Sequence, residues 1–126
     1  MPSEPVYSRA VITIDSHKAQ ITRLNHDSHH SHLIRASGKS TPQHNSDVRH
    51  VHEFFAAVCD DLTGLEQVLV TGGHSGLSEF RHYVTSHRPA LVNRIVGYET
   101  VNDPTEGQRV AFGRAYFDKI RDGLVP

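Results

Sequence analysis

The chain has 126 residues, of which 37% are hydrophobic and 21% charged, and its formal net charge is −1 with histidines neutral. This length suits one domain with a core of its own, and the near-zero charge excludes a strongly basic nucleic-acid binder. The 11 histidines make the protein cationic below neutral pH, because imidazole titrates near pH ~6.5. Cys59 is the only cysteine, which excludes an internal disulfide.

We find no targeting signal or membrane-spanning segment in the order of polar and apolar residues. Residues 1–5 are polar and contain proline, unlike a secretory leader. No apolar run approaches the ~20 residues that span a membrane. We therefore expect a cytoplasmic protein that folds as one domain over residues 1–126, with flexible tails at 1–8 and 121–126.

The first third of the chain predicts three short strands. Residues 9–14 (RAVITI) are rich in β-branched side chains, residues 18–24 (KAQITRL) alternate between apolar and polar, and residues 30–36 follow a second turn. Tight connections between them predict an antiparallel meander. Residues 37–47 (SGKSTPQHNSD) show no periodicity and predict a flexible loop.

A helix with one apolar stripe is expected next, begun by Ser46 or Asp47 and ended by Gly64. Cys59 lies on this stripe and is predicted to be a buried core thiol. The short apolar run 67–70 (QVLV) predicts a strand buried on both faces. The phenylalanines are also core candidates: Phe54, Phe55, Phe80, Phe112 and Phe117.

The last third predicts two helices around a fifth strand. Ser75 or Ser78 is expected to cap the first helix, and Pro89 to end it. The strand covers residues 95–101. Residues 103–106 (Asp-Pro-Thr-Glu) match a capping box in which Asp103 caps a final helix that runs to about Ile120.

The resulting order is βββαβαβα. A meander followed by two αβ units predicts a mixed five-stranded sheet with helices packed on it. This is the order of ribonuclease H-like α/β domains.

Three segments carry a resemblance to a known family: residues 14–21 (IDSHKAQI), 68–84 (VLVTGGHSGLSEFRHYV) and 96–117 (VGYETVNDPTEGQRVAFGRAYF). The third is the most specific, whereas in the first Ser16 and Gln20 replace residues that are more usually charged. From Arg9 to Phe117 the chain is similar to a bacterial family of translational machinery proteins. That family is related to the middle domain of archaeal and eukaryotic peptide-chain release factors and of Pelota.

This resemblance implies a ribonuclease H-like fold and a connection to the ribosome or RNA, without peptide release. Release factors carry a Gly-Gly-Gln tip between the third strand and the first helix, and the corresponding residues 37–47 contain no such triplet. Gly72-Gly73-His74 follows the fourth strand and so belongs to a different connection. We expect peptide-release activity to be absent.

A metal-dependent hydrolase or nuclease is the alternative. Ribonuclease H chemistry uses several carboxylates that hold two metals ~4 Å apart. Asp15 ends the first strand and Glu53 lies in the first helix, but the fourth strand ends in Thr71-Gly72-Gly73, without a carboxylate. We expect Asp15 to serve a turn and Glu53 to be exposed, so the chain is not expected to be an enzyme.

The histidine cluster His26, His29, His30 and His32 is a candidate metal site. His30 and His32 alternate along a strand, so they share a face and can hold zinc or nickel. A polar hairpin edge that discourages strand addition is the other interpretation. No cofactor is otherwise expected.

Two anion-binding candidates remain. The turn Gly72, Gly73, His74 and Ser75 links a strand to a helix, whose amides can bind a phosphate; a tight turn that needs glycine explains it equally well. The second is a basic patch of Arg35, Lys39, His44 and Arg49, which predicts salt-dependent RNA binding.

The leading hypothesis is a non-catalytic module that binds ribosomal or other structured RNA, or a translation factor. A self-associating homodimer is a third reading, common for so small a domain.

Overall fold

The computed structural model describes residues 7–36 and 44–123, and within this part the side chains of residues 44–48 are not described. Five strands and four helices alternate along the chain in almost the predicted order. They are β1 (Arg9–Ile14), β2 (Lys18–Leu24), β3 (His29–Arg35), α1 (His44–Asp61), β4 (Gln67–Gly72), α2 (His74–His87), α3 (Pro89–Val92), β5 (Ile95–Thr100) and α4 (Glu106–Arg121).

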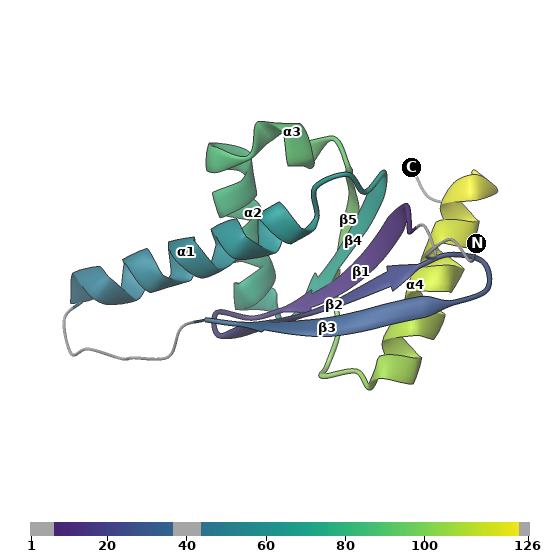
Figure 1. The fold of residues 1–126 in the computed structure, drawn as a ribbon, viewed down its shortest axis with the longest axis horizontal. Coiled ribbons are helices and arrows are strands. Elements are labelled where there is room, and N and C mark those ends of the chain that lie inside the picture. Colours follow the sequence, from purple (N-terminus) through teal and green to yellow (C-terminus); the bar gives the residue numbers. More distant parts are fainter. Residues whose placement is uncertain (1–6, 37–43, 124–126) are drawn as a thin grey trace, which may run out of the picture.

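The strands form one mixed sheet in the order β3-β2-β1-β4-β5. β1 to β3 pair antiparallel as a meander, while β4 pairs parallel with both β1 and β5. Helices α1 and α2 cover one face, and α4 lies against the other (Figure 1). The predicted α/β fold, a mixed five-stranded sheet with helices packed on it, is therefore confirmed.

Strand direction brings several chain segments to one end of the sheet. β1, β4 and β5 run parallel, and β3 runs the same way because two antiparallel pairings separate it from β1. These four strands end at Ile14, Arg35, Gly72 and Thr100. We call this end the carboxyl edge. α2 and α4 both begin there, directly after β4 and β5.

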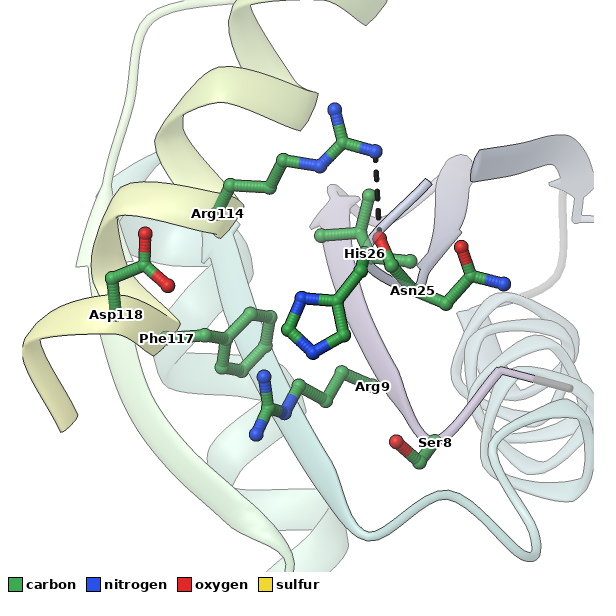
Figure 2. Close-up of a pocket in the computed structure, with 8 residues that line it drawn as sticks. Ser8, Arg9, Asn25, His26, Arg114, Phe117 and Asp118 are labelled. Carbon is green, nitrogen blue, oxygen red and sulfur yellow. Dashed lines mark hydrogen bonds between the residues drawn. The ribbon is translucent and has the colours of Figure 1, made fainter. Parts of the chain in front are cut away.

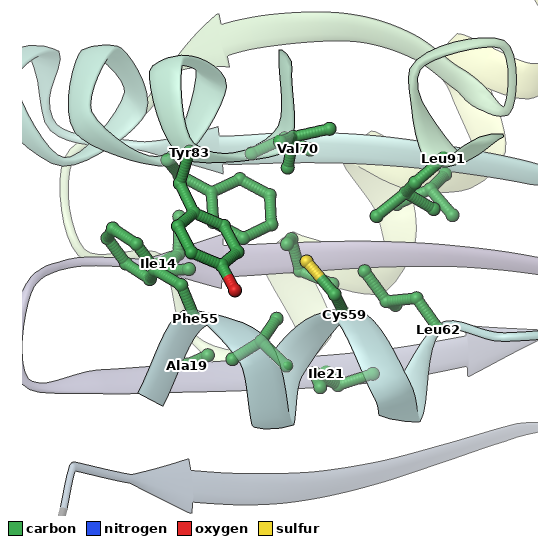
Figure 3. Close-up of a cluster of buried hydrophobic side chains, with 14 of the residues drawn as sticks. Ile14, Ala19, Ile21, Phe55, Cys59, Leu62, Val70, Tyr83 and Leu91 are labelled. Atoms are coloured by element: carbon green, nitrogen blue, oxygen red, sulfur yellow. The ribbon is translucent and has the colours of Figure 1, made fainter. Parts of the chain in front are cut away.

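The face under α1 and α2 holds the larger core (Figure 3). Ile12, Ile14 and Ile21 project from the strands, and the Phe55 and Phe80 rings meet edge to face with centroids 5.3 Å apart. All five side chains are at most 1% exposed. The alternation seen in the sequence therefore delivers one apolar side of each strand to this core.

The face under α4 holds a smaller core, made of Val11, Leu24, Leu69, Val110 and Phe117. Gly113 allows α4 to approach the sheet, since a Cβ built there would lie 2.9 Å from Val11 Cγ1. The strand β4 supplies Val68 and Val70 to one face and Leu69 to the other. The prediction that it is buried on both faces is confirmed.

Cys59 is 3% exposed within the larger core, as predicted. Burial raises the pKa of its thiol to about 11, so the neutral form dominates at physiological pH. Four of the five phenylalanines are buried, but Phe112 is 40% exposed, and the prediction for it was wrong. Its place on α4 turns it away from the small core that Val110 and Phe117 fill.

Two helices begin earlier than predicted. α1 starts at His44, so residues 44–47 are helical rather than loop, and residues 37–43 lie outside the described part. Residues 44–47 (HNSD) are all polar and carry no apolar register, which leaves the start undetermined by sequence. Gly73, not Ser75 or Ser78, is the N-cap of α2. That helix begins at once because Gly72 and Gly76 let its first turn pass close to the end of β1.

The start of α4 lies two residues later than predicted. Thr105 is the N-cap: its hydroxyl accepts from the Gln108 amide at 3.1 Å, and Gln108 Oε1 accepts from the Thr105 amide at 2.9 Å. Asp103 instead occupies a turn with φ of +44°. Residues 103–108 thus contain two overlapping capping boxes, Asp103 with Glu106 and Thr105 with Gln108. The second one forms in the structure.

The ends of the domain also differ slightly from prediction. The Ser8 carbonyl accepts hydrogen bonds from the amides of Glu66 and Gln67, and Arg121 is the last residue of α4, so both belong to the folded part. The short helix α3, which Pro89 begins, was not predicted. Within residues 7–36 and 44–123, no helix is long and apolar enough to cross a membrane.

Candidate functional site

A cavity of about 760 Å³ opens at the carboxyl edge, on the α4 side of the sheet. Strands β1, β2 and β4, the β5–α4 connection and the first turn of α4 all contribute to its wall. The side chains and turns that decide its chemistry are Thr13, Asp15, Lys18, Gln20, Gly72, Gly73, Asp103, Glu106 and Arg109. This placement matches the general rule that open α/β sheets bind ligands beyond the carboxyl ends of their parallel strands.

The glycine turn that the sequence singled out forms part of this wall. Gly72 has a φ of +155° and lies so close to the Ile14 carbonyl that a side chain would collide with it. Gly73 caps α2 without a side chain, which leaves the first amides of that helix uncapped. Gly72 and Gly73 line the cavity, whereas His74 and Ser75 are exposed and lie outside its wall.

Two exposed cations stand beside the cavity. Lys18, in its wall, is the direct register partner of Arg35, the last residue of β3. Like charges directly opposite each other on neighbouring strands repel. An anion placed between or above the two side chains would offset that repulsion.

A buried arginine forms the floor of the same cavity. Arg109 on α4 is 5% exposed, and its Nε donates to the Thr22 hydroxyl at 2.8 Å. Burial lowers the pKa of the guanidinium, and the Glu106 carboxylate opposes this effect. No carboxylate lies within ion-pairing distance of Arg109 in the part of the chain that the structure describes. Its positive charge is thus available to a ligand.

Three carboxylates moderate the charge of the cavity. Asp15 Oδ1 accepts from the amides of His17 at 2.6 Å and Lys18 at 2.8 Å, which is the predicted turn role. A hydrogen bond from Ser31, with His29 nearby, lowers the pKa of Glu106. Asp103 sits in the turn before α4. The cavity therefore mixes donors and acceptors instead of presenting a uniformly basic surface.

The predicted basic patch is divided by the sheet. Ile34 packs on the α1 side, so strand alternation directs Arg35 to the α4 side, whereas Arg49 is exposed on α1. Lys39 and the His44 side chain lie outside the described part. Arg35 and Arg49 therefore lie on different faces of the sheet, and RNA binding by the predicted patch stays a prediction. Arg35 joins Lys18 instead.

His30 and His32 share a face of β3, as predicted, with ring centroids 6.0 Å apart. His32 Nε2 lies 2.9 Å from Asp61 Oδ2, while His29 faces Glu106 across 3.7 Å on the other side of the sheet. Among the described residues, no three histidine, cysteine or carboxylate side chains converge as metal ligands. Zinc or nickel binding by His30 and His32 stays a prediction.

Asp15 and Glu53, the two carboxylates of the hydrolase alternative, lie in different places on the molecule. Asp15 is at the cavity, but Glu53 is exposed on α1, outside the cavity wall, as predicted. The cavity's own acidic residues are instead Asp103 and Glu106, which come from the β5–α4 segment.

Sequence reasoning missed Lys18, Gln20 and Arg109 as cavity residues. Arg109 offered one signal, since it interrupts an otherwise small and apolar helical face next to Val110 and Gly113. The proximity of Lys18 to Gly73 had no sequence signal, because the two residues are joined only through the pairing of β1 with β2 and β4.

Comparison with known proteins shows that the chain is similar to several solved structures. No protein-family model matches the chain, and no curated protein does. Among solved structures, Pelota from Thermoplasma acidophilum superposes on 89% of the chain with a TM-score of 0.63 and 11% identity. The archaeal translation termination factor aRF1 superposes on 91%, with a TM-score of 0.54 and 14% identity.

A third match is Dom34 from S. cerevisiae, described as a translation termination-like factor involved in RNA quality control and interacting with Hbs1. It covers 93% of the chain, with a TM-score of 0.54 and 12% identity. The chain spans about a third of the length of Pelota and Dom34 (33% and 35%) and 41% of aRF1. The predicted similarity to Pelota and release-factor domains is confirmed: the chain has the fold of one segment of these proteins.

Proposed function

We propose that this chain is a translation-associated binding module that docks on structured RNA, with ribosomal RNA as the first candidate, and that it lacks peptide-release activity. The observation that carries the proposal is the superposition of about nine-tenths of the chain on Pelota and aRF1. A translation termination factor, aRF1, and a translation termination-like factor, Dom34, share this arrangement of helices and strands with it.

The carboxyl edge supports RNA as the partner. Lys18 and Arg35 are exposed neighbours, the first amides of α2 are uncapped, and Arg109 adds a buried cation. Most contacts of proteins with nucleic acids go to phosphates, and exposed cations together with helix amides are their usual donors. The mixed charge of the cavity favours recognition of a structured RNA surface over nonspecific binding to any polyanion.

The sequence supports the absence of peptide release. Neither residues 37–47 nor the Gly72-Gly73-His74 turn contains Gly-Gly-Gln. The glycine pair instead shapes the tight passage from β4 to α2, where a side chain at Gly72 would collide with β1. A peptidyl-tRNA hydrolysis assay on ribosomes tests this directly, and release above the spontaneous rate would refute it.

Co-sedimentation with ribosomes, before and after ribonuclease treatment, tests the docking partner. We expect the protein to pellet with ribosomes and to stay in solution once the RNA is digested. Pelleting that survives digestion would assign the partner to a protein, such as a translation factor, and would contradict RNA docking.

The charge-reversed variant Lys18→Glu/Arg35→Glu tests the surface. If each cation contacts one phosphate, the slope of log affinity against log salt should become shallower by about 2. The control Arg81→Glu/Lys119→Glu changes the net charge equally at exposed positions of α2 and α4 outside the cavity. Equal loss of binding in both variants would show that overall charge, not this edge, drives association.

A further inference from the structure

A second cavity lies at the opposite end of the sheet. It has a volume of about 270 Å³ and lies between the amino end of β1, the turn after β2 and the last turns of α4 (Figure 2). The residues that matter for its chemistry are Arg9, Asn25, His26, Arg114, Phe117 and Asp118. None of them belongs to the carboxyl edge, so this cavity is separate from the proposed RNA-docking site.

Two arginines give this cavity its charge. Neither Arg9 nor Arg114 has a carboxylate within 4.0 Å among the described residues. Arg114 Nη2 reaches only the backbone carbonyls of Asn25 at 3.5 Å and Ser28 at 3.3 Å. Carbonyl groups carry no net charge, so they orient the guanidinium without neutralising it.

The remaining polar groups leave this positive charge in place. Asp118 also lines the cavity, but its Oδ1 is 3.5 Å from Arg121 Nη1, so it already has a cationic partner. Arg114 Nε is buried and has no hydrogen-bond partner in the part of the chain that the structure describes. Buried donors without partners are rare in folded proteins and call for a ligand or an ordered water.

The cations are held in place before any ligand arrives. The Arg9 guanidinium lies 5.7 Å from the centroid of the Phe117 ring, which is itself 3% exposed and fixed in the small core. Asn25 Oδ1 accepts from the Ser28 amide at 2.7 Å and from the Ser28 hydroxyl at 2.9 Å, which stabilises the turn that carries His26. Ligand binding therefore requires little ordering of side chains.

We infer that this cavity binds a phosphate group, as a monoester or a phosphodiester, between Arg9 and Arg114, with His26 as an additional donor. Guanidinium groups match phosphate oxygens in geometry as well as charge. The two arginines come from β1 and α4, so they can approach a tetrahedral anion from two sides (Figure 2). The volume, near the lower end of small-ligand cavities of roughly 300–1,000 Å³, suits one nucleotide unit.

Titration calorimetry of the full chain tests this with inorganic phosphate and AMP as probes. We expect saturable binding of AMP that weakens roughly tenfold or more in Arg9→Gln and in Arg114→Gln, because each loses hydrogen bonds to a charged group. Lys119→Gln, an exposed position on the same helix but outside the cavity wall, should bind as the wild type does. Two variants are used because Arg114 also supports the turn.

Competition with a short single-stranded RNA separates the two sources of the phosphate. Displacement of AMP by the RNA assigns the cavity to an RNA backbone, and AMP binding without displacement assigns it to a free phosphate ester; either result supports the inference. Absence of saturable phosphate or AMP binding, or wild-type affinity for AMP in both Arg9→Gln and Arg114→Gln, overturns it. Ribosome co-sedimentation of Lys18→Glu/Arg35→Glu, whose substituted residues lie outside this cavity, tests the carboxyl-edge proposal independently.

Discussion

The two faces of the sheet pack against their helices through different kinds of side chain. Under α1 and α2, aromatic and branched side chains such as Phe55, Phe80 and Ile12 form a large core that is almost fully buried. Under α4, the apolar cluster is small, and a buried arginine, Arg109, lies beside it with its hydroxyl partner Thr22. Both cavities described above have α4 in their walls.

This difference suggests a division of roles. Close-packed apolar interiors supply most of the stability of a small domain. Buried charges contribute little to stability and are commonly retained for specificity or ligand binding. We therefore expect substitutions on the α1/α2 face to change the free energy of unfolding most, and substitutions on the α4 face to act more on binding.

The largest effect is expected for Phe55→Ala. Removal of a fully buried ring leaves a cavity among Phe80 and Tyr83 and should lower the unfolding free energy by about 3–5 kcal/mol. The matched change Phe117→Ala should cost less, because the open cavity near Arg9 lets that site relax. Urea denaturation measures both; an equal or larger cost for Phe117→Ala would break the proposed contrast.

The next effect concerns the buried polar pair. Thr22→Val, Arg109→Met and the double variant form a thermodynamic cycle across the 2.8 Å hydrogen bond. Because the bond joins a charged donor to a buried hydroxyl, whose other partner is the Ser31 hydroxyl at 2.8 Å, we expect a coupling of about 1.5–3 kcal/mol in unfolding free energy. Urea denaturation of the four proteins supplies the cycle. If the two single variants have additive effects on the unfolding free energy, the hydrogen bond between Arg109 and Thr22 does not contribute to stability.

Two glycines of α4 provide a sharper test of how closely that helix approaches the sheet. Gly113→Ala places a methyl group 2.9 Å from Val11 Cγ1 and 3.1 Å from Leu24 Cδ1, and should cost about 1–3 kcal/mol. Gly107→Ala meets no atom within 4 Å, and should stabilise the helix by about 0.5 kcal/mol. Thermal unfolding followed by circular dichroism distinguishes them. A stabilising Gly113→Ala would mean that α4 packs loosely.

The smallest effect separates the two capping boxes. Thr105→Ala removes the acceptor of the Gln108 amide and should cost about 1 kcal/mol, whereas Thr105→Ser should retain stability. Asp103→Gly should cost nothing, because glycine tolerates the φ of +44°. Equilibrium unfolding in urea provides the comparison. A neutral Thr105→Ala would instead favour Asp103 as the cap.

The fold could be predicted because its signals are local. The β-branched run in residues 9–14, the alternation in residues 18–24, the apolar stripe of α1 and the buried run of β4 each appear within one element. Predictions failed where two local signals compete, as at Thr105 and Asp103, or where polar residues carry no register, as in residues 44–47.

The candidate site could be predicted only in part. Gly72 and Gly73 were found because a strand-to-helix turn requires glycine within a few residues. Lys18 and Arg109 were missed, since their meeting at the cavity depends on the pairing of β1 with β2 and on the docking of α4. Arg35 was paired with Arg49 although the strand's alternation sends it to the other face.

By itself, the sequence determined the order of the five strands and the three longer helices, the alternation of β2, and the absence of a Gly-Gly-Gln triplet in residues 37–47. Tertiary structure alone decided which charges meet: Lys18 with Arg35, Arg109 with Thr22, and Arg9 near Arg114. The physical reason is the separation along the chain over which each kind of interaction acts. Periodicity and turn chemistry act over a few residues, whereas the environment of a charge depends on strand pairing and helix docking between segments far apart in the chain.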